Sequence, residues 1–365
     1  MENNKRIGAI DTCKAFGIWL MLVAHASLGA DSPIGIFIFA FHMPLFFFLY
    51  GAQMSRQRLG AKSPRTALYG GIKGYIIPWF IFALLIDGLG PDLRLTFRRV
   101  VTILKSTHAS RDRALSMRAL WFLPCIFLAS LGFFAFCKIL KGQNDTVYSL
   151  IACTACLPLL AIASRLRNPS AYFDLPWGAN VALSGIAFML AGSVLRPYIL
   201  KAEGIKKWYL AAAGVLLLVI CGILNTRNVA LIRQLGWGYF YVDMGHAIYG
   251  SIKLFFINAC LGSVGLLALS YCLDNTFFQF VGQYTLGIML FQNIADKIVR
   301  LVPFDKLLPY PVWNITVATL NLFVALALSV ILSKIFPPAL GKSFKKKDAQ
   351  EGNRENITEK ETVKL

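Results

Sequence analysis

The first apolar block of the chain, residues 7–29, carries a carboxylate, an ammonium and an imidazole. Asp11, Lys14 and His25 stand in the run IGAIDTCKAFGIWLMLVAHASLG. Lys14 and His25 are eleven residues apart, so in an α-helix they lie within ~20° of one face and about 16 Å apart along the axis. Asp11 and Lys14 are spaced i, i+3, where opposite charges partly neutralise each other. The spacing predicts a stripe with an ion pair at one end and an imidazole at the other.

A second imidazole, His42, stands in the next apolar block, residues 34–54, in the run FIFAFHMPLFFFLYG. Pro44 frees a backbone carbonyl and is expected to bend this helix in mid-block. We expect His42 to lie in the outer half of the neighbouring helix, somewhat deeper in the bundle than His25. An imidazole can remove a proton from an alcohol that attacks a carbonyl carbon. A histidine inside a membrane can also serve only as a hydrogen bonder between helices, and both interpretations stay open for His42.

The rest of the sequence limits the reaction mechanisms that these residues could support. It contains no G-x-S-x-G elbow, no cluster of residues at metal-ligand spacing and no phosphate-binding glycine loop. A direct, histidine-assisted transfer without a metal is therefore favoured over a serine acyl-enzyme. Asp11, His25 and His42 form the candidate catalytic group. Lys14 is suited to hold a phosphate of a donor threaded between the helices, because cation–phosphate pairing is strong inside a bundle.

The elements that must position these residues are membrane-spanning helices. Of 365 residues, 57% are apolar and only 15% are charged, and the mean hydropathy is +0.60. The apolar blocks have the length that crosses a ~30 Å hydrocarbon core as a helix. Ionisable groups inside such helices are costly unless they face the protein interior. The sequence predicts an all-α polytopic bundle with ten spans, at about 7–29, 34–54, 67–87, 119–140, 147–164, 178–196, 208–225, 248–272, 278–299 and 312–336.

Basic residues indicate the orientation of the bundle. Cytoplasmic loops carry an excess of Lys and Arg, and such residues precede the first span and follow the second, sixth and tenth: Lys5, Arg6, Arg56, Arg58, Lys62, Arg65, Arg196, Lys201, Lys206, Lys207, Lys342, Lys345, Lys346 and Lys347. Both termini are therefore expected in the cytoplasm. Residues 1–340 are expected to form one membrane domain, and the hydrophilic residues 341–365 are expected to be a disordered basic and polar cytoplasmic tail.

Two outward loops carry further candidates. The basic segment 88–118 contradicts the charge rule, so either a span nearby is miscounted or the loop holds an anionic acceptor. The loop 226–247 carries Asp243 and His246, which are candidates for substrate binding, although a solvated loop is the simpler interpretation. Trp121 either packs at the membrane interface or stacks on a sugar.

The net charge of +19 raises the question of a nucleic-acid partner. Lys and Arg are spread over short loops, as topology signals are, and there is no basic domain or nucleic-acid-binding motif, so no such partner is expected. The eight cysteines lie almost all in apolar blocks and predict small buried thiols rather than a disulfide framework.

At these residues the sequence resembles the acyltransferase family 3 membrane proteins, which include bacterial O-acetyltransferases of lipopolysaccharide, capsule and other envelope sugars. Lys14 and His25 match the family's basic-x10-His signature. The segment 41–51, FHMPLFFFLYG, is similar to the second-helix motif of the fucose O-acetylase-like branch, and 119–127, ALWFLPCIF, resembles a Trp-Phe-Leu-Pro stretch. The resemblance extends over about residues 6–336.

The resemblance implies a ten-helix domain in the bacterial cytoplasmic membrane that uses acetyl-CoA as donor. The implied acceptor is a hydroxyl of a lipid-linked or polymeric envelope sugar. His25 is then the main catalytic residue, and Lys14 supports donor binding. Two positions depart from the family. The third span offers only Lys73 as a candidate for donor binding, where the family has an arginine-rich entry. Gln292 stands where the family often has a histidine.

Two other classes of function compete with the enzyme. A transporter or flippase would use the charged stripe as a substrate path, but the ionisable residues crowd into the first 80 positions rather than recurring in related halves. A non-catalytic scaffold or sensor would leave the buried Asp11, Lys14 and His25 unexplained.

Overall fold

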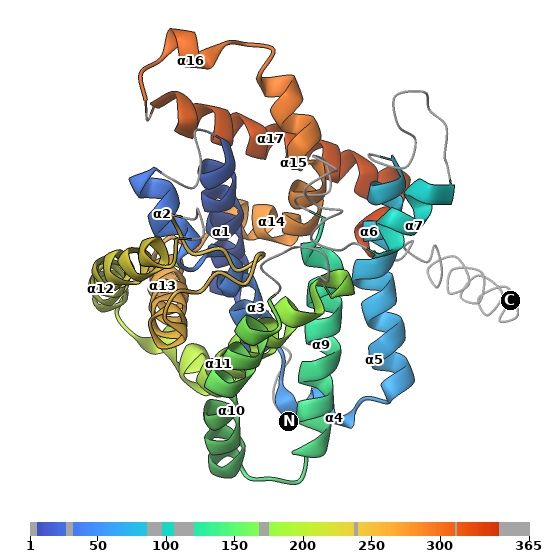
Figure 1. The fold of residues 1–365 in the computed structure, drawn as a ribbon, viewed down its shortest axis with the longest axis vertical. Helices are drawn as coiled ribbons and strands as arrows, with labels where there is room; N and C mark the ends of the chain where they lie inside the picture. The colour runs from blue at the N-terminus through green and yellow to red at the C-terminus, as the bar shows by residue number, and fades with distance from the viewer. Residues whose placement is uncertain are drawn as a thin grey trace, which may run out of the picture.

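The structure is a computed structural model that describes residues 6–26, 32–85, 97–105, 120–167, 175–236, 240–310 and 312–342. In these ranges the chain forms helices joined by short turns (Figure 1). The β-structure there is limited to an isolated bridge between Asp243 and Ile248. The predicted all-α class is confirmed.

The helices follow the predicted apolar blocks closely. Their bounds are α1 Gly8–Ala26, α2 Pro33–Phe39, α3 His42–Gln53, α4 Arg56–Ala61, α5 Pro64–Gly71, the π-helical η2 Ile72–Ile76, α6 Ile77–Ala83, α7 Phe97–Lys105, α9 Phe122–Ile139, α10 Asp145–Arg165, α11 Ala179–Lys201, α12 Lys207–Gln234, α13 Ile252–Cys272, α14 Thr276–Gln283, α15 Thr285–Val299, α16 Phe304–Leu307 and α17 Val312–Ile335.

Seven helical runs in the described ranges are long and apolar enough to cross a membrane. They are Pro33–Gln53, Phe122–Ile139, Asp145–Arg165, Pro176–Gly204, Lys207–Gln234, Ile252–Cys272 and Val312–Ile335. The other predicted spans coincide with α1, with the run α5–η2–α6, and with the pair α14 and α15, which is interrupted at Tyr284. A polytopic helical bundle is thus what the chain forms. The total of ten spans and the cytoplasmic termini stay predictions, and the tail from residue 343 lies outside the described residues.

The second span is broken rather than merely bent. Helix α2 ends at Phe39, and α3 restarts at His42. The break lies at Ala40 and Phe41, because the ring of Pro44 lacks an N–H and clashes with the carbonyl four residues earlier. His42 is therefore the first residue of a helix instead of lying inside one.

The loop predicted at 226–247 is shorter than expected. Helix α12 continues to Gln234, so Arg227 and Arg233 are helical. The sequence suggested an earlier end because the apolar run stops near residue 225, but Asn225 and Asn228 are buried and continue the helix by packing inward. The connection to α13 consequently begins at Leu235.

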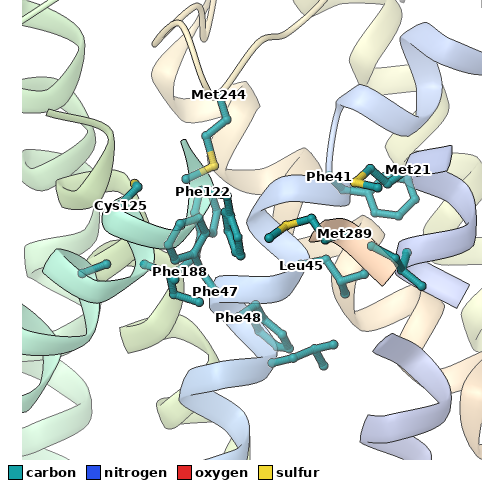
Figure 2. Close-up of a cluster of buried hydrophobic side chains, with 14 of the residues drawn as sticks. Met21, Phe41, Leu45, Phe47, Phe48, Phe122, Cys125, Phe188, Met244 and Met289 are labelled. Atoms are coloured by element: carbon teal, nitrogen blue, oxygen red, sulfur yellow. The ribbon is translucent and has the colours of Figure 1, made fainter. Parts of the chain in front are cut away.

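Helix α1 occupies the interior of the bundle, in contact with α3, α13, α14 and α17 (Figure 1). Around the C-terminal half of α1, aromatic and methionine side chains from several elements form one core cluster. Figure 2 shows Met21 of α1, Phe47 of α3, Phe122 of α9 and Phe188 of α11 together, with Met244 reaching down from the loop before α13. This core holds the α12–α13 loop against α3 and α9.

Candidate active site

His25 and His42 lie side by side. Their ring centroids are 6.1 Å apart, with the planes at 76°. Phe39 contacts both rings, at 5.4 Å from His25 and 4.7 Å from His42. His25 is exposed at the end of α1, whereas His42 is buried. The two imidazoles lie on neighbouring helices, as expected, and their relative depth in a membrane stays a prediction.

The break in the second span determines how His42 is oriented. Its Nδ1 lies 3.1 Å from the carbonyl oxygen of Ile38, the last-turn residue of α2. In the neutral ring Nδ1 is then the donor, and Nε2 carries the lone pair. Nε2 is buried and has no hydrogen-bond partner among the described residues. Because an unsatisfied buried polar atom is costly, this nitrogen is suited to accept a hydrogen bond from a substrate.

Asp243 and His246 form a pair on a tight hairpin. The Nδ1 of His246 lies 2.6 Å from Asp243 Oδ2, and the His246 amide donates to Asp243 Oδ1 at 3.1 Å. Backbone hydrogen bonds of 2.9 and 2.8 Å join Asp243 and Ile248. The side chains of His246 and Asp243 are only 28% and 14% exposed. The interpretation of this segment as a solvated loop is therefore wrong.

The hairpin is anchored to two helices. The hydroxyl of Tyr249 lies 2.6 Å from that of Ser184 on α11, and Asn228 of α12 donates to the Tyr249 carbonyl at 2.9 Å. Ala247 adopts a positive φ of 55°, which a non-glycine residue rarely does unless its surroundings hold it. The Asp243–His246 pair is therefore presented on a fixed support.

The hairpin and the two imidazoles belong to one site. Tyr241, just before the hairpin, packs on Phe39 at 4.8 Å. The indole of Trp121 packs directly on Gly245, and Asp243 is close enough to His42 to interact with it electrostatically. Three of the four histidines of the chain thus gather here, while His108 lies outside the described residues. We call His25, His42, Trp121, Asp243 and His246 the histidine cluster.

A second polar group lies at the opposite end of α1. Lys14 Nζ is 3.4 Å from Asp11 Oδ1 and donates to Gln53 Oε1 at 2.8 Å, which confirms the predicted ion pair. Arg6 forms a further ion pair with Asp11. We call Arg6, Asp11, Lys14 and Gln53 the cationic cluster. Asp11 is about 21 Å from His25 along the helix axis, so the structure separates it from the two imidazoles with which the sequence grouped it.

Two further residues that the sequence singled out lie on other helices. Lys73 is half-buried in η2, on a helical run that packs on α9, and its role in donor binding stays a prediction. Gln292 is buried in α15, where its carbonyl accepts a hydrogen bond from Asn321. Of the basic segment 88–118, only 97–105 is described, as α7. In the part of the chain that the structure describes, no group of acidic, histidine or cysteine residues could hold a metal.

Sequence reasoning missed the aromatic residues of the site. Phe39 and Tyr241 come from α2 and the α12–α13 loop, and nothing in a run of membrane-type aromatics distinguishes a residue that contacts two imidazoles from one that packs in the core. The only available signal was the position of Phe39 three residues before His42.

The fold and the site together define a polytopic helical membrane protein with a histidine cluster at one end of its central helix. A family model described as an acyltransferase domain matches residues 7–334. The chain belongs to acyltransferase family 3 and is a multi-pass membrane acyltransferase. No match was found among curated proteins or among solved structures. The resemblance to the fucose O-acetylase-like branch stays a prediction.

Proposed function

We propose that the protein transfers an acetyl group from acetyl-CoA to a hydroxyl of a cell-envelope sugar, in an O-antigen, capsule or related polysaccharide precursor, at the bacterial cytoplasmic membrane. The observation that carries this proposal is the pair His25 and His42, 6.1 Å apart, with the buried Nε2 of His42 without a partner in the described residues. Two adjacent imidazoles supply the acid–base groups that a direct acyl transfer needs.

The length of α1 fits a donor of this kind. Lys14 and His25 are about 16 Å apart along the helix. The pantetheine arm of coenzyme A has about twelve bonds between its diphosphate and its sulfur, as many as four peptide residues, and therefore extends ~13–14 Å. A phosphate bound near Lys14 would thus place the thioester close to the two imidazoles.

In the proposed reaction, His25 removes the proton from the sugar hydroxyl while the oxygen of that hydroxyl attacks the thioester carbonyl carbon. A C–O bond forms, the C–S bond breaks, and the departing thiolate takes the proton from the imidazolium of His25. His42 accepts a hydrogen bond at Nε2 and positions the reacting groups. Trp121 offers an aromatic face for the sugar ring, and Asp243 and His246 bind other hydroxyls of the acceptor.

The test is acetylation itself. Envelope polysaccharides from cells with and without the protein are compared by mass spectrometry, and purified protein in nanodiscs is supplied with labelled acetyl-CoA and the acceptor identified in this way. We expect one added acetyl group per repeat unit, bound as an alkali-labile ester. Identical polysaccharides from both cell types, with no transfer of label in nanodiscs, would refute the proposal.

The hairpin leads to a prediction about the acceptor. Asp243→Asn keeps the shape of the turn but replaces a carboxylate that bonds to His246 at 2.6 Å. Because hydrogen bonds to charged groups contribute ~1.5–3 kcal/mol, we expect the KM for the sugar to rise about 10-fold or more. The measurement is steady-state acetyl transfer at varied acceptor.

A matched control for this prediction is Asp296→Asn, which removes the partly exposed ion pair between Asp296 of α15 and Arg300, the residue after that helix. This control should leave the KM for the sugar unchanged. An Asp243→Asn protein with the KM of the wild type would show that the hairpin does not bind the acceptor.

A further inference from the structure

A third cation lies beside the cationic cluster, although its sequence position indicated only membrane topology. Arg196 lies near the C-terminal end of α11. Its Nη1 donates to the carbonyl oxygens of Ala52, at 2.7 Å, and Gln53, at 2.9 Å. The side chain of Gln53 in turn accepts a hydrogen bond from Lys14. Gln53, the last residue of α3, therefore links Arg196 to Lys14 through hydrogen bonds to both.

Close packing of two helices fixes Arg196 in this place. A Cβ at Gly51 of α3 would overlap the carbonyl oxygen of Met189, and a Cβ at Gly192 of α11 would overlap that of Phe48. Small residues of this kind let the backbones of membrane helices approach closely. Gly192 lies one turn before Arg196, so the guanidinium is held against the end of α3 before any ligand arrives.

Cations outnumber carboxylates at this end of α1. Arg6, Lys14 and Arg196 contribute three positive charges, and Asp11 is the carboxylate that pairs with Arg6 and Lys14. Asp274, which accepts a hydrogen bond from Thr12, is a second carboxylate beside the start of α1, so positive charge is still in excess among these described contacts. In addition, the Nε of Arg196 is buried and has no acceptor among the described residues.

Capping of α3 explains only part of this arrangement. The contacts of Nη1 satisfy two carbonyls at the end of the helix, as cations at helix C-termini do. They leave the buried Nε–H of Arg196 unpaired, which destabilises the protein when no ligand is bound. An anion with several oxygens would satisfy that N–H and neutralise the excess charge at once.

We propose that Arg196 and Lys14 together bind phosphate oxygens at this end of the bundle. The planar guanidinium fork matches the geometry of phosphate, and the lysine adds a point charge. This inference rests on the proposed function, since the phosphate is assigned to the diphosphate of the coenzyme A donor. The headgroup of an anionic phospholipid has the same chemistry and is the other source of such a phosphate.

The test measures binding without catalysis. Full-length protein in phosphatidylcholine nanodiscs is titrated calorimetrically with coenzyme A and with pantetheine, which lacks the phosphates. Arg196→Ala should weaken coenzyme A binding about 10- to 100-fold, as expected for hydrogen bonds to a charged group, and leave pantetheine binding unchanged. Arg196→Lys keeps the charge but loses the fork, so its affinity should fall between the two.

Lys201→Ala is the matched control, because Lys201 is exposed at the end of the same helix and should have no effect. Pantetheine affinity and thermal unfolding, measured on each variant, report whether the fold is intact. If Arg196→Ala does not fold, the loss of affinity in Arg196→Lys decides the question.

The outcomes separate the two proposals. Unchanged coenzyme A affinity in both Arg196 variants would overturn the inference and leave the proposed donor in place. A wild-type protein without affinity for coenzyme A would overturn both the proposed donor and the phosphate site. The exception is a wild-type protein that binds no coenzyme A but retains phosphatidylglycerol, with the lipid lost from the Arg196 variants. That last result would keep the phosphate site, assign it to a lipid and reject the donor.

Discussion

His25→Ala should abolish acetyl transfer while leaving the protein folded in the membrane. General acid–base catalysis by a positioned side chain contributes about 10²- to 10⁴-fold to a rate, and kcat should fall by that factor. His25 is exposed at the end of α1, so its removal opens no buried cavity and the thermal unfolding temperature should not change. The measurement is transfer of labelled acetyl groups by purified protein in nanodiscs.

Coenzyme A binding provides the control for this variant. If His25 acts on the reacting atoms rather than on the donor's phosphates, His25→Ala should bind coenzyme A as the wild type does, because the cationic cluster lies about 16 Å away. A His25→Ala protein with full activity would remove the basis of the proposed mechanism. Loss of folding instead of activity would show a structural role.

Gly51→Ala should destabilise the whole bundle. The added Cβ would overlap the carbonyl oxygen of Met189, and because the obstacle is backbone, α3 and α11 must move apart. Overpacking a well-packed core costs about 1–3 kcal/mol, and we expect the high end of this range. Yield in the membrane and the thermal unfolding temperature should both fall, as measured by fluorescence-detected size-exclusion chromatography after heating.

Gly70→Ala is the matched control. Gly70 lies in α5, and a Cβ there meets no atom within 4 Å. Alanine has a helix propensity up to ~1 kcal/mol better than that of glycine, so this variant should be as stable as the wild type or slightly more stable. Equal stability of the Gly51 and Gly70 variants would show that α3 and α11 do not pack this closely.

The sequence predicted the parts of the site that depend on helical periodicity. Lys14 and His25 share a helix because apolar residues surround them for a full membrane span, and the i, i+3 spacing of Asp11 and Lys14 led correctly to an ion pair. The placement of His25 and His42 on neighbouring helices followed from their positions in two consecutive apolar blocks.

The other parts depend on contacts between distant segments. Arg196 meets Gln53 only because α11 packs on α3 through Gly51 and Gly192, and a single sequence gives no sign of this pairing. The break at Ala40 was placed at Pro44 instead, because the steric effect of proline acts four residues upstream. Likewise, the hairpin that carries Asp243 is anchored through Tyr249 to Ser184, which is 65 residues away in the sequence.

The anchored hairpin has a practical consequence for anyone who wishes to tag or cut this protein. Its ends are tied to α11 and α12, and its side chains complete a site begun some 200 residues earlier. Epitope insertions are therefore better accommodated in the exposed turn at 141–143 than between residues 243 and 248. A fragment that ends before α12 would retain the imidazoles of His25 and His42 and lack the hairpin that carries Asp243 and His246.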